Sequence, residues 1–371
     1  MAAGCDFSAV VTKDVAAGGH HSMFVTSKCI LLGWGKNECG QLGQDNIESN
    51  GMPEKSEMNT FGDAGAAMVA WGAQHTVVLA TSQCVWTCGD GVHGQLGHGD
   101  LQEMRGFTLV REELFLQAKI VMVACGDQHS VALDVEATLW VWGENEHGQL
   151  GLNDHLNRWL PARVLPSNVH TVVPAIDEVI GQDFGGHVPV LVTAGGAHTA
   201  VVTEEGSMWV TGCGANGRLG LHVEHTKNSV LFRWVGTDQT FCGSHVLMAA
   251  CGKKHTLAVT KKGEMHFEYA NIVCAACGSR HCAAVTAEGS LFTWGSAKGL
   301  GHAAMHTQLR PTLVCPSLFQ GARIGRCHTI PQAHVLAFAM GMHARFGAGV
   351  DDDKPPDNTL AMSAPTAKLC V

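Results

Sequence analysis

The chain has 371 residues, of which 45 are Gly and only 15% are charged, and its formal net charge is -9. A negative balance opposes a broad electrostatic grip on nucleic acid, which needs clustered Lys and Arg, so we expect no strong direct nucleic-acid binding. Fifteen Cys, an odd number, and no leader-like segment after Met1 predict a reduced compartment, the cytosol or the nucleus. No apolar run approaches the roughly 18 residues of a spanning helix, so we expect no membrane anchoring.

One short motif, Gly-x-x-His-Ser/Thr, recurs along the chain. Its copies are residues 18–22, 72–76, 126–130, 195–199, 252–256 and 325–329, with 278–282 as a variant that carries Cys in place of Ser or Thr. We call the histidines of these seven copies the anchor histidines: His21, His75, His129, His198, His255, His281 and His328. Seven copies spaced around a ring cannot converge on one substrate, so we expect structural hydrogen bonds from them rather than catalysis.

A second motif, typically Trp-Gly-x-Asn-x-x-Gly-Gln-Leu-Gly, follows at a fixed offset. Trp34 lies 13 residues after His21, Trp142 lies 13 after His129, and Trp294 lies 13 after His281. Between the two motifs each copy reads as two short apolar strands around a tight turn. A repeat with several short strands and a recurring Trp is typical of a propeller blade, so we expect an all-β fold.

The paired motifs resemble the regulator of chromosome condensation repeat family over most of the chain. The resemblance implies a seven-bladed β-propeller, with residues 1–349 as a single domain and the strand at 7–11 available to close the ring. The acidic, Pro-containing segment 350–371 is expected to be a disordered tail.

The repeat is interrupted at the fifth blade. Successive anchor histidines are 54, 54, 69, 57, 26 and 47 residues apart, so the interval between His255 and His281 lacks about half a blade. Two or three residues cannot run from an outer strand to the next blade's innermost strand, because extended chain spans only about 3.5 Å per residue. We therefore predict an incomplete fifth blade with distortion at residues 265–273, as a shortened isoform or a misjoined coding segment would produce.

Several patterns suggest chemistry, but the repeat favours a structural role for each. Three Cys-x-x-x-His pairs have the ligand types of zinc: Cys125 with His129, Cys251 with His255, and Cys277 with His281. Equivalent positions hold Trp71 and Ala194, so we expect these Cys to pack as small apolar side chains and we predict no metal site. The two Gly-x-Gly-x-x-Gly runs, 89–94 and 212–217, precede no helix, so we expect no nucleotide or other cofactor.

The recurring tryptophans are expected to fill the wedges between blades: Trp34, Trp86, Trp140, Trp142, Trp209 and Trp294. The family also includes a plant ultraviolet photoreceptor with clustered Trp and a Gly-Trp-Arg-His-Thr motif. Here Gln74, Gln128 and Lys254 precede the anchors, so we do not expect a photoreceptor.

The variable pair inside each Gly-x-x-His is expected to lie on one propeller face, where loops on a rigid scaffold bind partners. The candidate partner-binding residues are His20, Gln74, Asp127, Gln128, Lys253, Lys254 and Arg280. We expect a monomeric interaction scaffold or regulatory module that binds a protein, without catalytic chemistry of its own.

The alternative is a guanine nucleotide exchange factor for a Ran-type small GTPase, linked to chromatin or nuclear transport. The resemblance implies that activity for some family members, which use a wedge-like excursion, acidic residues on one face and a basic tail. Here Asp127 is the single acidic residue among the variable pairs and no basic tail is visible, which favours the scaffold.

Overall fold

The computed structural model describes residues 12–17, 21–26, 28–55, 61–62, 64–164, 184–221, 227–236, 241, 244–261, 272–296, 300, 307–315, 324–329, 335–339, 344–345 and 367–368. Among these residues the fold is built from β-strands and two short 3-10 turns, η1 (Glu112–Phe115) and η2 (Ala215–Gly217). None of the helices in this described part is long and apolar enough to span a bilayer.

Five sheets have four antiparallel strands each, hydrogen-bonded in chain order, and we call them blades. The first contains β1 (Thr12–Ala17), β2 (His21–Thr26), β3 (Leu31–Gly35) and β4 (Asn50–Lys55). The next contains β5 (Ala66–Trp71), β6 (His75–Ala80), β7 (Val85–Gly89) and β8 (Met104–Leu109). The third contains β9 (Ile120–Cys125), β10 (His129–Asp134), β11 (Leu139–Gly143) and β12 (Arg158–Val164). The fourth contains β13 (Pro189–Ala194), β14 (His198–Thr203), β15 (Met208–Gly212) and β16 (Ser229–Val235). The last contains β19 (Ile272–Cys277), β20 (His281–Thr286), β21 (Leu291–Gly295) and β22 (Gln308–Leu313).

The remaining sheets of the described chain have two strands each. One joins β17 (Val246–Cys251) to β18 (Thr256–Thr260), and we call it the short sheet. Another joins β23 (Ile324–Thr329) to β24 (Val335–Ala339). The third pairs β25 (Ala344–Arg345) in parallel with β26 (Ala367–Lys368).

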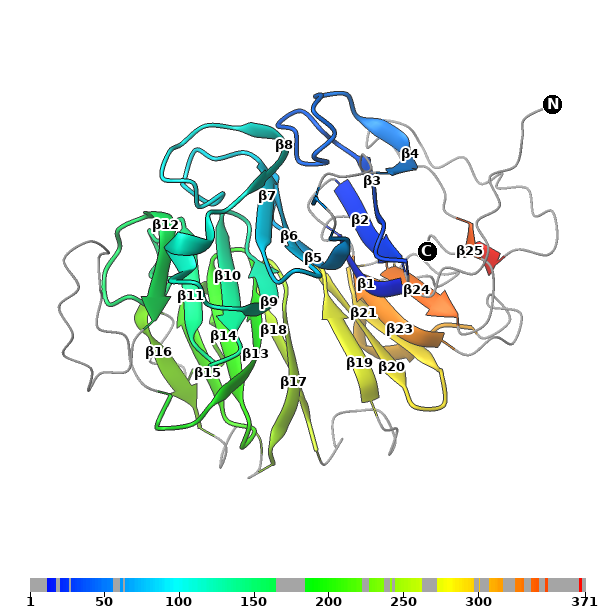
Figure 1. Cartoon of the computed structure of the whole chain (residues 1–371). Helices are drawn as coiled ribbons and strands as arrows, with labels where there is room; N and C mark the ends of the chain where they lie inside the picture. The colour runs from blue at the N-terminus through cyan, green and yellow to red at the C-terminus, as the bar shows by residue number, and fades with distance from the viewer. Residues whose placement is uncertain are drawn as a thin grey trace, which may run out of the picture.

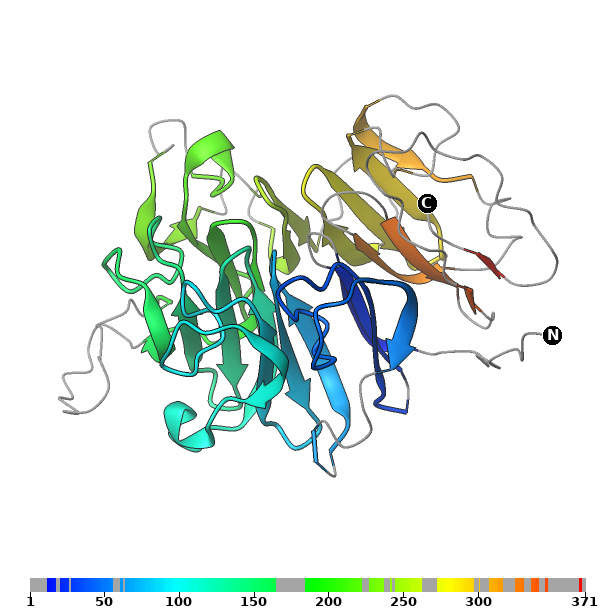
Figure 2. The same ribbon diagram turned by 90° about the horizontal axis from the view of Figure 1, so that it is seen from above.

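The sheets stand side by side around a common centre (Figures 1 and 2). Their innermost strands contact one another in the order β1, β5, β9, β13, β17, β19 and β23, and β23 lies against β1. A central cavity of about 370 Å³ is lined by residues of β5, β9, β13, β17 and β19 and the turns that follow them. The described part of the chain is therefore a closed β-propeller.

The second strand of each blade explains why the repeat is so apolar. Every residue of β6, β10, β14 and β20 is buried, because neighbouring sheets cover both faces of these strands. In the short sheet, by contrast, all five residues of β18 are only half-buried. Among the described residues, the sheet with only two strands thus has the less buried second strand.

The glycine that follows the recurring aromatic position is needed for the turn out of the third strand. Gly143 has a φ of 101°, and a Cβ there would lie 2.6 Å from the carbonyl oxygen of Gln128. Left-handed backbone and close approach both exclude larger residues at this position.

The two irregular repeats behave differently from the rest. The short interval after His255 corresponds to the short sheet, and residues 265–271 of the segment where we predicted distortion lie outside the described residues. In the seventh copy the Gly-x-x-His motif lies inside β23, with Arg326 paired to Phe338, so the turn that we expected at this motif is a strand there. The side chain of His328, the segment 7–11 and the tail 350–371 other than β26 also lie outside the described part.

Candidate partner-binding face

Each regular Gly-x-x-His motif forms a tight turn between the first and second strands. The glycine N–H donates to the histidine carbonyl in five consecutive copies, from Gly72 to His75 (2.9 Å) through Gly278 to His281 (2.8 Å). This hydrogen bond leaves the two variable residues at the tip of the turn. In the described copies from the second to the sixth, these pairs lie in the turns between the first and second strands.

The first glycine of the motif is required by space rather than by its φ angle. A Cβ on Gly126 would collide with the imidazole of His129 and with the carbonyl oxygen of Gly195, the equivalent glycine of the next blade. Gly72, Gly195 and Gly252 have the equivalent two neighbours, the imidazole of their own motif and the carbonyl oxygen of the next motif's glycine. The motif therefore allows the histidine ring to lie over its own turn while the next blade packs closely against it.

The anchor histidines connect neighbouring blades. Their Nε2 atoms contact the hydroxyl of the Ser or Thr that follows the next anchor: His21 to Thr76 at 3.1 Å, His75 to Ser130 at 3.0 Å, His129 to Thr199 at 3.0 Å and His198 to Thr256 at 2.9 Å. That hydroxyl in turn donates to a main-chain carbonyl of the Gln-Leu-Gly or Arg-Leu-Gly loop, as in Thr199 Oγ1 to Gln149 O at 2.7 Å. These four histidines therefore make hydrogen bonds between blades.

The direction of the hydroxyl's hydrogen bond places a proton on Nε2 of the imidazole. Because the hydroxyl donates to a carbonyl, it must accept from Nε2–H, and the ring is neutral because burial opposes a second proton on Nδ1. Burial lowers the pKa of His75, His129 and His198 to about 3. Their Nδ1 atoms are buried and have no partner in the described part of the chain, so protonation would leave an unpaired charge inside the ring.

Several tips of the turns contact one another at the mouth of the cavity. Ala73 N–H donates to Asp127 O at 2.9 Å, and Asp127 N–H donates to Gly196 O at 3.3 Å. Lys253 Nζ lies 3.0 Å from Asp127 Oδ2, and the two side chains are 44% and 35% exposed. We call the variable residues 73–74, 127–128, 196–197, 253–254 and 279–280 the rim face.

The predicted binding residues divide into two groups on this face. Lys253, Lys254 and Arg280 are exposed, while Gln74 and Gln128 are half-buried. The main-chain carbonyls of these two glutamines accept from Asp90 N–H and Glu144 N–H, each at 2.9 Å. His20 lies outside the described residues. The rim face is therefore basic near the short sheet and carries Asp127 as its acidic group.

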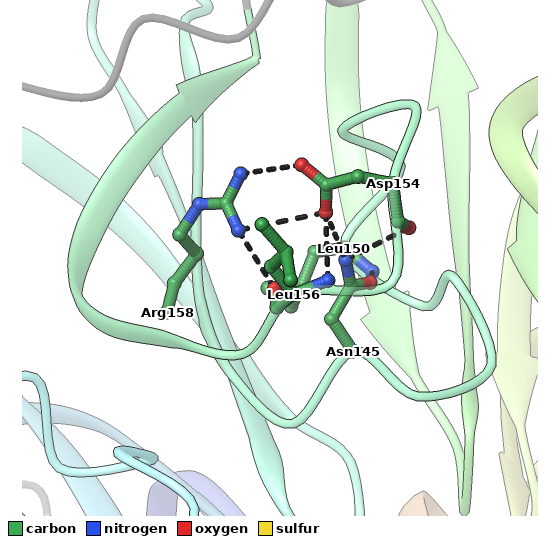
Figure 3. Close-up of polar contacts among 5 residues, drawn as sticks. All are labelled: Asn145, Leu150, Asp154, Leu156 and Arg158. Atoms are coloured by element: carbon green, nitrogen blue, oxygen red, sulfur yellow. Dashed lines mark hydrogen bonds and ion pairs between the residues drawn. The ribbon is translucent and has the colours of Figure 1, made fainter.

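A second set of loops surrounds the rim, and its fixing residue was not singled out from sequence. In the loop after β11, Asn145 is fully buried and its Nδ2 donates to Asp154 O (3.0 Å) and Oδ1 (2.9 Å), while its Oδ1 accepts from Leu150 N–H (3.0 Å) (Figure 3). Arg158 Nη2 contacts Asp154 Oδ2 at 2.6 Å. Asn37 makes the same contacts to Asn46 and Leu42. The repeated Asn of the second motif was the available signal.

The Cys-x-x-x-His pairs do not act as pairs within a repeat. Each anchor ring points to the following blade, whereas the thiols of Cys125 and Cys251 lie beside Ser130 and Thr256 of their own hairpins. Burial raises the pKa of both thiols well above the usual value, so they pack as neutral groups. Cys277 has different surroundings, which are described below.

Half of the six recurring tryptophans are buried in the core, and Trp86, Trp209 and Trp294 are half-buried. Trp34, Trp140 and Trp142 are buried, and Phe115 meets Trp140 and Trp142 edge-on with ring centroids 5.4 and 5.8 Å apart. Trp142 Nε1 donates to Gln95 O at 2.9 Å. The glycine-rich run 212–217 contains η2 and is followed by β16, so it continues the repeat.

Comparison with known proteins identifies the repeat. The model of the regulator of chromosome condensation (RCC1) repeat matches residues 30–79, 83–133 and 136–202, and a second model of this repeat matches 120–149. The ultraviolet-B receptor UVR8 of Arabidopsis thaliana is 32% identical over 253 residues, which are 68% of this chain and 52% of the receptor. The probable E3 ubiquitin-protein ligase HERC6 of Homo sapiens is 26% identical over 94% of this chain and 30% of the ligase. The chain thus spans about half or less of these relatives.

A solved structure supports the same fold. In the crystal structure of Kap60 bound to yeast RCC1 (Prp20), the matched chain superposes with a TM-score of 0.70 at 17% identity, covering 91% of this chain and 80% of the other.

Proposed function

Because this chain belongs to the regulator of chromosome condensation repeat family, we propose that it is a propeller scaffold that binds a protein partner through the rim face. The observation that carries the proposal is the group of exposed basic residues, Lys253, Lys254 and Arg280, on short turns held by main-chain hydrogen bonds. Because the backbone of these turns is already fixed, binding a partner costs little additional backbone conformational entropy.

The charges of the rim contribute little to the stability of the propeller. An ion pair as exposed as Lys253 with Asp127 is worth about 0–1 kcal/mol, so its side chains can exchange partners at low cost. A basic group beside a single carboxylate favours a partner that presents acidic side chains. The resemblance to HERC6 and to the yeast RCC1 chain bound to Kap60 supports a protein as that partner.

We infer further that the ring has seven blade positions, with the short sheet as the fifth and β23–β24 as the seventh. Seven innermost strands in mutual contact support this number. We also propose that the chain works as a monomer in the cytosol or nucleus.

The scaffold is tested by affinity capture with two matched variants. Lys253→Glu/Lys254→Glu/Arg280→Glu reverses the rim, and Lys28→Glu/Lys119→Glu/Lys261→Glu makes the same charge change with exposed residues at the opposite end of the sheets. We expect the wild type and the control variant to recover the same partner protein. The amount recovered with the rim variant should be at least tenfold lower. Equal recovery with both variants would show that the rim face is not the binding surface.

Exchange on a Ran-type GTPase, linked to chromatin or nuclear transport, is the second candidate, and the fold of yeast RCC1 supports it. The test follows release of a fluorescent GDP analogue from Ran with excess GTP. Acceleration by wild type and not by the rim variant would establish exchange through this face. If folded protein leaves the rate of GDP release at its spontaneous value, exchange on Ran is excluded and the scaffold function remains the proposal.

A further inference from the structure

Two thiols and an imidazole meet where the short sheet adjoins blade β19–β22. Cys282 Sγ lies 3.1 Å from His255 Nε2 and 3.5 Å from Cys277 Sγ. The three ligand atoms all lie within 4.8 Å of one another, and Cys282 is buried. The cluster joins residues of two adjacent sheets.

This junction differs from the four before it in the ring. At each of those, the anchor Nε2 meets a hydroxyl, and the hydroxyl donates to a carbonyl of the preceding blade's outer loop at 2.6 to 2.8 Å. Between His255 and His281 the sequence has no Gln-Leu-Gly or Arg-Leu-Gly triplet. At the same junction the hydroxyl residue is replaced by Cys282, so the substitution accompanies the loss of the loop that supplies the carbonyl elsewhere.

Cys277 completes the cluster because of strand register. It is paired directly with Cys282 across β19 and β20. Gly278 and His281 form the hydrogen-bonded pair at the turn, so the next pair is the non-hydrogen-bonded one, in which side chains stand closest. Cys251 occupies the same position in the preceding copy but faces Thr256 at 4.0 Å, which makes the double-Cys arrangement specific to the sixth copy.

The spacing suits a tetrahedral thiophilic cation. With Zn–S near 2.3 Å and Zn–N near 2.0 Å, two sulfurs are about 3.8 Å apart and sulfur and nitrogen about 3.5 Å apart. The Cys277–Cys282 sulfur separation of 3.5 Å and the Cys282–His255 separation of 3.1 Å lie within about 0.4 Å of these values, and the ligand atoms of Cys277 and His255 lie within 4.8 Å of each other. A thiolate is the form of cysteine that binds metal.

We propose that His255, Cys277 and Cys282 bind one Zn²⁺, which joins the short sheet to blade β19–β22. Two thiolates balance the charge of the cation, and imidazole and thiolate are its preferred ligands. Cys277 lines the central cavity, so water from the cavity supplies the fourth ligand. The metal substitutes for the hydroxyl-to-carbonyl link that holds the other junctions.

The test measures metal content and a Co²⁺ spectrum of the reduced full chain. We expect about one bound Zn²⁺ per chain and, after replacement by Co²⁺, a thiolate-to-cobalt charge-transfer band with the visible bands of tetrahedral cobalt. Cys282→Ser should abolish both signals while retaining the fold, because it restores the residue type of the other junctions. Cys251→Ser is the matched control and should retain them.

Stability gives a second readout. Chelation should lower the melting temperature of wild type by at least about 3 °C and leave that of Cys282→Ser unchanged. The proposal is wrong if the reduced wild type takes up no Co²⁺ with thiolate character, if Cys282→Ser retains the band, or if chelation shifts both proteins equally.

Discussion

At the scale of single residues, the polar groups of the repeat are consumed by its own architecture. His75, His129 and His198 are neutral donors with a pKa of about 3, which disqualifies them as general bases at neutral pH. Buried Asn145 uses both ends of its amide to hold a surface loop. Side chains that look chemically competent in the sequence therefore join the blades and fix the loops beside the rim face.

Asn145→Ala is expected to destabilise the protein by about 2–3 kcal/mol. The change leaves the Leu150 N–H and the Asp154 carbonyl without their buried partner, and an unsatisfied buried group costs about 1–3 kcal/mol. The midpoint of denaturant unfolding measures the loss. Gln102→Ala, at an exposed position, is the control and should change the midpoint little. Equal midpoints for wild type and Asn145→Ala would contradict the role of this amide.

At the scale of elements, the repeat predicted the strands and turns because period, turn residues and recurring Trp all act locally. It could not predict which groups meet across blades. His129 meets Thr199 from 70 residues away, and the zinc-like pairs of the sequence regroup as His255 with Cys277 and Cys282. Contacts between repeats depend on the angle between sheets, which no motif within one repeat encodes.

Thr199→Val tests the junction between blades β9–β12 and β13–β16. The hydroxyl is fully buried and both accepts from His129 and donates to Gln149 O, so its removal leaves two polar groups unpaired. We expect a loss of about 2–4 kcal/mol in the free energy of unfolding. Thr138→Val, whose hydroxyl has no hydrogen-bond partner in the described part of the chain, should lose less than about 1 kcal/mol. Similar losses for both would refute the junction's contribution.

The short sheet should open more readily than a full blade. β18 is half-buried throughout, whereas β10 and β14 are fully buried, and poorly buried strands exchange amide hydrogens through small local openings. Hydrogen exchange followed by mass spectrometry should show the 256–260 amides exchanging at least tenfold faster than those of β10. The prediction fails if peptides from the two strands exchange at the same rate.

At the scale of the whole molecule, a ring closed by neutral histidines should be sensitive to acid. The pKa of His75, His129 and His198 falls from 6.5 to about 3 on folding. The unfolded chain therefore binds more protons between these values, and stability must fall as the pH falls. The contribution is complete above about pH 6.5 and decreases toward pH 3.

The expected loss is large because three sites act together. At pH 5 each histidine costs about 2 kcal/mol relative to pH 7.5, about 6 kcal/mol in all, against a typical total stability of about 5–15 kcal/mol. Urea unfolding at pH 7.5, 6 and 5 measures the change. Between pH 7.5 and 6 ordinary carboxylates stay ionised, so the loss of about 2–3 kcal/mol expected in that window belongs to the histidines. A free energy of unfolding that stays constant from pH 7.5 to 6 would mean that these imidazoles are protonated as easily in the folded propeller as in the unfolded chain. The neutral Nε2–H assignment would then be wrong.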